Sequence, residues 1–337
     1  MKHYIQKIIN GEHLSPDDAA DAMLTIMEGN ATDAQIGAFI TALKMKGEHV
    51  DELAAFVKIM RDKSLKVNLN GTRALDMCGT GGDNSGTFNI STVASFVVAG
   101  AGASVAKHGN RSISSKCGSA DLLKFLGINI SLPPEHATRC ILDTGIGFLF
   151  APAYHPAMKY AANPRRELGV KTMFNMMGPM TNPAGVGHQL VGAFNFDAAD
   201  KMAHVFSQLG AAHVLVVHSS DGIDEISLSG KTTVFEVSGE QPVRKFEITP
   251  EEFGFTPAPL SALLGDTVET NADICMHVLQ GKPGPHRDIV VLNAGFGLFA
   301  GERASTPVEG IRMAIESIDS GNALKKLHEL IDSSNSA

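Results

Sequence analysis

A glycine-rich turn and the residues after it have the types and spacing of a phosphate-binding site. The turn, Gly79 to Asp83, directly follows a short apolar segment that ends at Cys78. Glycines permit positive φ and the close approach of a ligand, and such turns can aim successive N–H groups at an anion. Candidate helix N-caps follow at Thr87, Asn89, Ser91 and Thr92. This order predicts a phosphate cradle at the start of a helix.

A second loop with the same chemistry follows a predicted strand at Ser104 to Ala106. It runs from Lys107 to Lys116 and combines three cations with a glycine and several hydroxyls. If the two strands are parallel neighbours, both loops open at the same edge of a sheet, which is where ligands bind in open α/β folds.

Two common nucleotide-binding motifs do not fit the glycine-rich turn. No Gly-Lys-Ser/Thr tripeptide closes it, as a Walker motif requires, and Asn84 stands where a dinucleotide-binding motif needs a glycine. A tight strand-to-helix turn without a ligand is a simpler interpretation of the glycines alone. The hydroxyl-rich and cationic residues that follow favour an anion site instead.

Asp224 and Glu225 form an acidic pair just beyond a predicted strand at His213 to His218. In a loop their carboxylates can converge at the sheet edge that carries the anion loops. Mg²⁺ prefers one or two carboxylates together with waters and substrate phosphates. The pair therefore suggests a magnesium site, although a solvated turn is the plainer alternative.

Further polar residues are candidates for contacting an organic substrate. Arg165 and Arg166 follow Pro164, which is expected to interrupt a helix that begins near Ala157. A guanidinium can bind a carboxylate through two hydrogen bonds, but a single arginine is more often a surface charge. His108 and His155 are candidate bases and, more simply, loop residues that form hydrogen bonds.

Composition indicates an ordinary globular protein. The chain has 337 residues, of which 44% are hydrophobic and 19% charged, with no apolar run long enough for a membrane span. A net charge of −8 and a pI of about 5.9 argue against non-specific nucleic-acid binding. No secretory signal is visible, and four cysteines without a CxxC spacing suit a reducing compartment. We therefore expect a cytoplasmic protein.

The sequence predicts two domains. Residues 1–70 form a small all-helical domain. Helices are expected to start at Ser15-Pro16 and at Thr32, and a last helix is expected at 50–62. Residues 71–337 form a larger α/β domain with a mainly parallel central sheet, including strands at 128–132 and 147–150, an antiparallel pair at 234–237 and 243–248, and helices over most of 260–331. The short N-terminal helices cannot bury all their apolar faces alone, so they should pack on the rest of the chain or on a second subunit, and dimerisation is one hypothesis.

The order of motifs resembles that of the anthranilate phosphoribosyltransferases, related to the pyrimidine nucleoside phosphorylases. The matching motifs are Cys-Gly-Thr-Gly-Gly-Asp at 78–83, Asn-Ile-Ser-Thr at 89–92, Lys-His-Gly-Asn-Arg at 107–111, Gly-Ser-Ala-Asp at 118–121, His-Pro-Ala-Met at 155–158 and Asp-Glu at 224–225. The resemblance implies transfer of phosphoribose from phosphoribosyl pyrophosphate (PRPP) to the amine of anthranilate, in tryptophan biosynthesis. It also implies a homodimer joined through the helical domain, to which parts of 158–185 return.

The resemblance also implies roles for individual residues. Lys107, Asn110 and Arg165 would be catalytic, and Ser91, Asp224 and Glu225 would hold Mg²⁺, with two ions per subunit. Anthranilate would contact Gly79, Asn110, His155 and Arg165. PRPP would be bound by Gly79, Gly82, Asp83, Thr87, Asn89, Ile90, Ser91, Thr92, Lys107, His108, Gly109, Asn110, Arg111, Ser112, Ile113, Ser114, Ser115 and Ser119.

Two other functions fit parts of the sequence. A pyrimidine nucleoside phosphorylase would use the same architecture with inorganic phosphate, but Lys107 to Arg111 differs from the Lys-His-Ser-Thr-Gly-Gly type of loop in those enzymes. A non-catalytic paralogue that binds nucleic acid is disfavoured by the acidic pI and by the presence of Asp224 and Glu225. We therefore expect the protein to bind neither nucleic acid nor a membrane.

Overall fold

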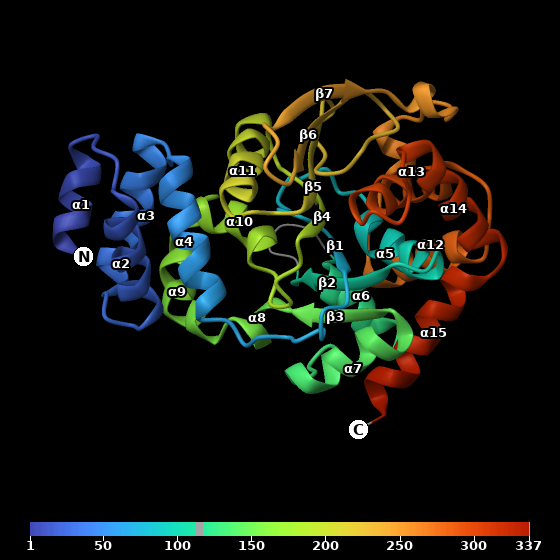
Figure 1. Ribbon diagram of the computed structural model, residues 1–337, viewed down its shortest axis with the longest axis horizontal. Helices are drawn as coiled ribbons and strands as arrows, with labels where there is room; N and C mark the ends of the chain where they lie inside the picture. The colour runs from blue at the N-terminus through green and yellow to red at the C-terminus, as the bar shows by residue number, and fades with distance from the viewer. Residues whose placement is uncertain (112–116, 337) are drawn as a thin grey trace.

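The structure, a computed structural model, describes residues 1–111 and 117–336. Figure 1 shows a small helical lobe beside a larger lobe built around a sheet. The helical lobe contains α1 (Lys2–Ile9), α2 (Pro16–Met27), α3 (Asp33–Lys46) and α4 (Val50–Asp62).

The predicted helix boundaries of this lobe are confirmed. The Ser15 side chain accepts a hydrogen bond from the Asp18 N–H at the start of α2. Thr32 and Gln35 form a reciprocal capping box at the start of α3. Gly47, with φ of +88°, ends α3 in a conformation that other residues rarely adopt. Local side-chain chemistry therefore determines where these helices begin and end.

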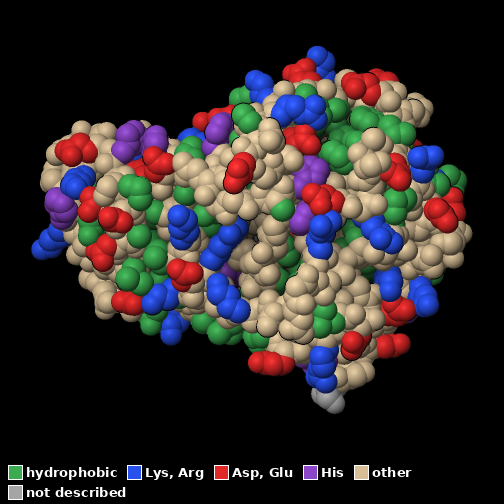
Figure 2. Space-filling model, in the orientation of Figure 1, with side chains coloured by type: hydrophobic (Ala, Val, Ile, Leu, Met, Phe, Trp, Pro, Cys, Tyr) green, Lys and Arg blue, Asp and Glu red, His purple; other side chains and the backbone are tan. Residues whose placement is uncertain are grey.

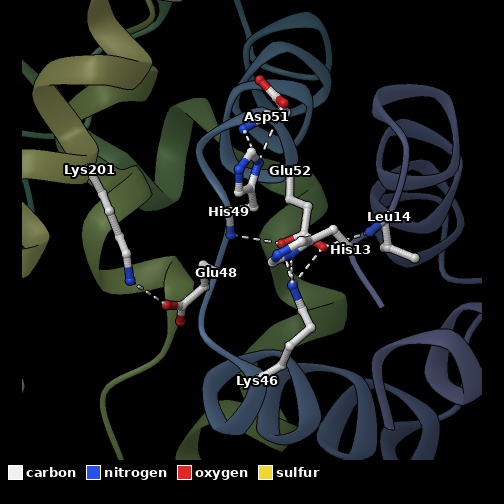
Figure 3. Close-up of polar contacts among 8 residues, drawn as sticks. All are labelled: His13, Leu14, Lys46, Glu48, His49, Asp51, Glu52 and Lys201. Atoms are coloured by element: carbon white, nitrogen blue, oxygen red, sulfur yellow. Dashed lines mark hydrogen bonds and ion pairs between the residues drawn. The ribbon is translucent and has the colours of Figure 1, made fainter. Parts of the chain in front are cut away.

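A buried ion pair joins three parts of the helical lobe (Figure 3). The fully buried Glu52 carboxylate accepts hydrogen bonds from Lys46 Nζ at 2.9 and 3.0 Å. It also accepts from the backbone N–H groups of Leu14 and His49, each at 2.8 Å. Because these four bonds satisfy the carboxylate, the charge can be buried where the turn before α2, the end of α3 and the start of α4 meet.

The described residues of the larger lobe form a seven-stranded sheet in the order β3-β2-β1-β4-β5-β6-β7. The first five strands in this order are parallel, and the antiparallel pairing of β6 with β5 and β7 confirms the predicted mixed sheet. The strands are β1 (Ala74–Gly79), β2 (Ser104–Gly109), β3 (Ile146–Phe150), β4 (His188–Gly192), β5 (His213–Ser219), β6 (Thr232–Ser238) and β7 (Arg244–Ile248). The order reverses between β1 and β4, and ligands of open α/β sheets bind beyond the carboxyl ends of the strands at such a point.

Helices cover both faces of the sheet because its strands are apolar on both sides. In β5, Leu215 and Val217 pack in one core with α5 and α13, whereas Val214 and Val216 pack in the other with α11 and α4. The second core extends into the helical lobe, which Figure 1 shows beside α10 and α11.

The remaining helices complete these two layers. They are α5 (Ile90–Gly100), α6 (Ser119–Phe125), α7 (Pro134–Thr144), α8 (Ala151–Tyr154), α9 (Lys159–Leu168), α10 (Met173–Met177), α11 (Phe196–Gln208), α12 (Val268–Leu279), α13 (Pro285–Ala300), α14 (Pro307–Asp319) and α15 (Asn322–Asn335), with short 3-10 turns η1 (Pro156–Met158), η2 (Gly178–Thr181), η3 (Pro250–Phe253) and η4 (Leu260–Leu263). None of the helices in the described ranges is both long and apolar enough to cross a membrane.

The predicted interruption at Pro164 is wrong. Helix α9 continues through this buried proline to Leu168 and packs against α2 and α3. Asn163 helps to fix it there by donating to the Asp33 carboxylate at 2.7 Å. Tertiary packing therefore outweighs the local cost of proline. A boundary between domains at residues 70 and 71 stays a prediction.

The predicted strand at 128–132 is also wrong. Ile128, Ile130 and Leu132 are buried in alternation, which is the pattern that suggested a strand. Their segment nevertheless joins no ladder, because Asn129 donates its N–H to Ser334 Oγ at 3.0 Å instead of to a neighbouring strand. The chain is extended here but packs on α15.

We expect the Glu52→Ala variant to lose about 3–5 kcal/mol of unfolding free energy, because it leaves the Lys46 charge buried without its partner. Glu28→Ala is the matched control, since Glu28 pairs with Lys63 at 2.8 Å while both side chains are more than a third exposed. That change should cost no more than about 1 kcal/mol. Urea denaturation followed by circular dichroism measures both, and equal losses would contradict a dominant role for the buried pair.

Candidate functional site

The candidate site lies where the parallel strands end. Strands β1, β2 and β4 end at Gly79, Gly109 and Gly192, so their loops meet at one edge of the sheet. The predicted parallel pairing of β1 with β2 is confirmed. In the turn after β1, Gly81 and Gly82 have φ of +65° and +71°. This conformation suits a turn whose N–H groups point inward at an anion.

Asp224 is packed directly against this turn. Its Oδ2 accepts a hydrogen bond of 2.7 Å from the Gly81 N–H. A Cβ atom on Gly79 would collide with the Asp224 carboxylate, and one on Gly192 with the Asp224 backbone carbonyl. The absence of side chains at both positions therefore lets the acidic loop reach the end of β1. Gly192 was not among the residues selected from the sequence, because only its close approach to Asp224 reveals its importance.

Glu225, Ser91 and Lys107 form the second half of the cluster. Glu225 Oε1 accepts from the Ser91 N–H at 3.1 Å, in the first turn of α5. Lys107 Nζ donates to the Met77 carbonyl at 2.5 Å and to Ser91 Oγ at 3.4 Å. These contacts bring a carboxylate, a hydroxyl and an ammonium together beside the glycine-rich turn.

Lys107 and His108 lie inside β2, which corrects their predicted position in the loop after a shorter strand. They continue the parallel ladder, opposite Phe148 and Leu149 of β3. Lys107 is consequently only 4% exposed. Its ammonium reaches the site from beneath the cradle and not from a surface loop.

Burial raises the pKa of both acidic side chains. The pKa of Asp224 rises to about 7, first through burial and then through the nearby Asp83 carboxylate. The pKa of Glu225 rises to about 8, through burial and then through the charge of Asp224. Carboxylates that repel one another in this way form a favourable environment for a divalent cation.

The donor set fits Mg²⁺ bound together with a phosphorylated substrate. Within the described residues, no group of three His, Cys, Asp or Glu side chains is arranged to hold a metal alone. Asp224, Glu225 and the Ser91 hydroxyl instead offer a few oxygen ligands on one side. Mg²⁺ typically takes its remaining ligands from waters and phosphate oxygens.

Helix α5 begins at Ile90, and its N-cap residue is Asn89, one of the four candidates in the sequence. The Asn89 side chain does not cap the helix; it donates to the Cys117 carbonyl at 3.1 Å. Ile90 and Thr92 have buried side chains, so a ligand can meet them only through their backbone. The helix N-terminus remains directed at the cradle.

Other predicted phosphate-binding residues lie along the same edge. Asp83 accepts a hydrogen bond of 2.6 Å from Ser85 Oγ, which also contacts Thr87. Ser119 Oγ donates to the Asn110 carbonyl at 3.0 Å and so joins α6 to the loop after Gly109. Arg111 places its guanidinium 5.8 Å from the Phe150 ring. The predicted residues Ser112, Ile113, Ser114 and Ser115 lie outside the described residues.

His108 and His155 lie side by side, with ring centroids 5.2 Å apart. Burial lowers the pKa of His108 to about 3 and that of His155 to about 4, so both rings are neutral near pH 7. The Nε2 atom of each ring is buried and has no hydrogen-bond partner among the described residues. Two unpaired ring nitrogens are thus shielded from solvent in this histidine pair.

Arg165 lies in the last turn of α9, where its guanidinium is 5.0 Å from the Phe174 ring. Burial lowers the pKa of Arg165. No contact in the described part of the chain joins Arg165 to Gly79 or Asn110, although the resemblance assigned all three residues to anthranilate. Arg165 lies in the segment that packs on the helical lobe.

A buried polar network below the site was missed in the sequence. The Asp76 carboxylate, fully buried in β1, accepts from the His108 N–H at 3.1 Å and from Asn182 Nδ2 at 2.8 Å. Gln189 Nε2 approaches it at 3.4 Å and donates to the Pro179 carbonyl at 3.0 Å. Burial raises the pKa of Asp76 to about 6, although the charge of Lys107 opposes the rise. The sequence signal that could have revealed this network is an acidic residue within an otherwise apolar strand.

Comparisons with known proteins identify this architecture. Residues 2–64 match the helical bundle domain of the glycosyl transferase family, and residues 71–324 match its a/b domain. The anthranilate phosphoribosyltransferase of Herpetosiphon aurantiacus is 50% identical over 336 residues, covering 99% of both chains. That of Moorella thermoacetica is 49% identical over 331 residues, covering 98% of this chain and 97% of the relative.

Solved structures agree with these relatives. The anthranilate phosphoribosyltransferase of Thermus thermophilus superposes with a TM-score of 0.93 at 39% identity, covering 99% of each chain. That of Saccharomyces cerevisiae, solved in complex with PRPP and Mg, gives a TM-score of 0.92 at 30% identity, covering 99% of this chain and 98% of that one. The chain therefore belongs to the glycosyl transferase family and, within it, to the anthranilate phosphoribosyltransferases.

The two buried histidines should each lower the stability of the protein in acid, while the raised pKa values of Asp76, Asp224 and Glu225 act in the opposite direction. Unfolded histidine binds a proton as the pH falls through 6.5, whereas folded His155 and His108 do so only near pH 4 and 3. The unfolded state therefore binds more protons below pH 6.5, and between pH 7 and 5 each histidine should cost on the order of 2 kcal/mol of stability. The contributions of the carboxyl groups are common to the parent and the variant, so between pH 7 and 5 the change in unfolding free energy should be more favourable in the His155→Gln variant by on the order of 2 kcal/mol. Denaturation of both proteins at both pH values measures this difference.

The surface variant His204→Gln is the control and should retain the parent's pH dependence, since this side chain is about half exposed. An unchanged loss in His155→Gln would contradict the assignment.

Proposed function

We propose that the site transfers the 5-phosphoribosyl group of PRPP to the amine of anthranilate, giving N-(5-phosphoribosyl)anthranilate and pyrophosphate in tryptophan biosynthesis. This proposal rests mainly on one observation: the glycine-rich turn, Lys107 and the Asp224–Glu225 pair converge at one edge of the sheet. A phosphate cradle beside a magnesium-type site suits displacement of a diphosphate.

The PRPP phosphates are assigned to the glycine-rich turn, the N-terminal end of α5 and the loop after β2. The partial positive charge of the helix N-terminus favours an anion at this position. The proposed residues are Gly79, Gly82, Asp83, Thr87, Asn89 to Thr92, Lys107 to Ser115 and Ser119.

The reaction needs positioning and charge stabilisation more than a strong base. The amine nitrogen forms a bond to C1 of the ribose while the C1–O bond breaks, and pyrophosphate leaves with the electron pair. The nitrogen then releases a proton to solvent; an aromatic amine is already neutral at pH 7. Lys107, held beneath the cradle by Met77 and Ser91, stabilises the negative charge that develops on the leaving group.

Ser91, Asp224 and Glu225 are the proposed Mg²⁺ ligands, directly or through waters. Bound Mg²⁺ neutralises charge on the leaving diphosphate. The raised pKa values of the two carboxyls support this assignment, because a cation would relieve the repulsion among them. We further propose two ions per subunit and a cytoplasmic location.

Anthranilate is proposed to contact Gly79, Asn110, His155 and Arg165. Its carboxylate requires a cation, and the Arg165 guanidinium, packed on Phe174, is already oriented. Lys107, Asn110 and Arg165 are thus the proposed catalytic set, in which Asn110 joins the two substrates.

The Arg165→Ala variant should raise the KM for anthranilate at least about tenfold, because a charge-assisted bond to the carboxylate is lost, and should change the KM for PRPP little. The loss of anthranilate fluorescence on adding enzyme, PRPP and Mg²⁺ measures both constants, and EDTA should abolish it. The control is Arg166→Ala, because Arg166 is the exposed neighbour and contacts Asn163. Phosphorolysis of a pyrimidine nucleoside in place of anthranilate consumption would overturn the function.

We also propose that the protein is a homodimer joined through the helical lobe. Ile9 of α1 and Met45 of α3 are 64% and 84% exposed, and their helices pack together. Apolar side chains this exposed on neighbouring helices are typical of an interface.

The Met45→Glu variant should therefore shift the protein towards monomer in sedimentation velocity, since it buries an unpaired charge in the interface. Val308→Glu on α14, where Val308 is 53% exposed, is the control and should leave the mass unchanged. A parent protein that sediments as a monomer at every concentration would refute the dimer.

A further inference from the structure

Lys171 stands beside the glycine-rich turn without belonging to any motif in the sequence. It lies between α9 and α10, in the segment that packs on the helical lobe. A Cβ atom built on Gly82 would lie 3.1 Å from Lys171 Cε and 3.7 Å from its Nζ. The ammonium is therefore next to the backbone of the turn.

The aromatic ring of Phe194 holds the Lys171 ammonium in this position. Its Nζ lies 4.5 Å from the centroid of Phe194, which follows the end of β4. The side chain is half-buried. A cation over an aromatic face is oriented but keeps most of its capacity to donate hydrogen bonds.

No acidic residue in 1–111 or 117–336 neutralises the Lys171 charge through an ion pair. Among the described residues no carboxylate forms an ion pair with it, although Asp83 follows Gly82 directly. Structural lysines of this chain have such partners, as Lys46 has Glu52 and Lys201 has Glu48 and Asp197. An oriented and unpaired ammonium suits an anion that arrives from outside.

The proposed phosphate site requires positive charge to bind PRPP. PRPP carries phosphate groups at both ends, while the nearest protein groups include the carboxylates of Asp83, Asp224 and Glu225. Lys107 is buried and already bonded to Met77 and Ser91. Figure 2 shows Lys and Arg side chains gathered along the hollow between the two lobes, so this face is suited to a highly negative ligand.

We infer that Lys171 is a further PRPP-binding residue whose ammonium contacts the diphosphate over the Gly81–Gly82 turn. The inference rests on the proposed function and adds to it a cation carried by the segment between α9 and α10. Since that segment packs on the helical lobe, the contact joins the lobe to the bound diphosphate.

The Lys171→Met variant tests this role, because methionine keeps an unbranched apolar stem over Phe194 and removes only the charge. The KM for PRPP should rise about 5- to 30-fold, as expected for one charge-assisted hydrogen bond in a half-buried site. The KM for anthranilate and the melting temperature should change little. Lys171→Arg should restore the KM for PRPP to within about threefold of the parent value.

Lys245→Met is the matched control, since Lys245 places its ammonium 5.2 Å from the Phe196 ring but lies on β7, away from the cradle. It should leave the KM for PRPP unchanged. A Lys171→Met variant with the parent's KM for PRPP, or one that only melts earlier, would overturn the inference.

Isothermal titration with PRPP and Mg²⁺ separates this outcome from failure of the proposed function. If the parent protein binds PRPP and Lys171→Met binds it equally well, Lys171 has no such role. If the parent protein itself binds no PRPP, the proposed function fails first.

Discussion

The whole site depends on bringing negatively charged side chains to a place that is also proposed to bind a negatively charged substrate. Asp224 reaches the end of β1 only because Gly79 and Gly192 have no side chains, and the Gly81 N–H holds its carboxylate there. The cluster is electrostatically unfavourable by itself, as the raised pKa values of Asp224 and Glu225 indicate. A divalent cation and phosphates, as proposed for this site, would make the cluster favourable.

Beneath this cluster, a second buried carboxylate organises the sheet. Asp76 joins β1 to the backbone of β2 and to Asn182, whose amide also donates to Ala106 at 2.8 Å. Gln189 links the same network to η2. The strands that carry Gly79 and Lys107 are therefore held in register by side chains as well as by the ladder, and removing Asp76 would leave several buried donors unpaired.

The two lobes meet through the segment between β3 and β4. Arg61 of α4 donates to the Met180 carbonyl of η2, within this segment, at 2.8 Å. A second contact lies beyond β4, where Lys201 of α11 pairs with Glu48 at 3.4 Å. Arg165 and Lys171 belong to the segment between β3 and β4. Groups proposed for the two substrates thus come from both sides of the hollow, which gives substrate binding a means to affect the position of the helical lobe.

The sequence by itself determined the elements whose signals are local. Capping residues at Ser15 and Thr32, the glycine-rich turn after β1 and the acidic pair after β5 were all recognisable, because each depends on neighbours within a few residues. The motif order was also sufficient to indicate the family. Only the tertiary structure decided what depends on distant contacts: α9 continues through Pro164 because it packs on α2 and α3, and 128–132 remains outside the sheet because its N–H groups bond elsewhere. Burial of Lys107 in β2, the role of Gly192 and the position of Lys171 beside Gly82 likewise join residues far apart in the chain, where no local pattern carries the information.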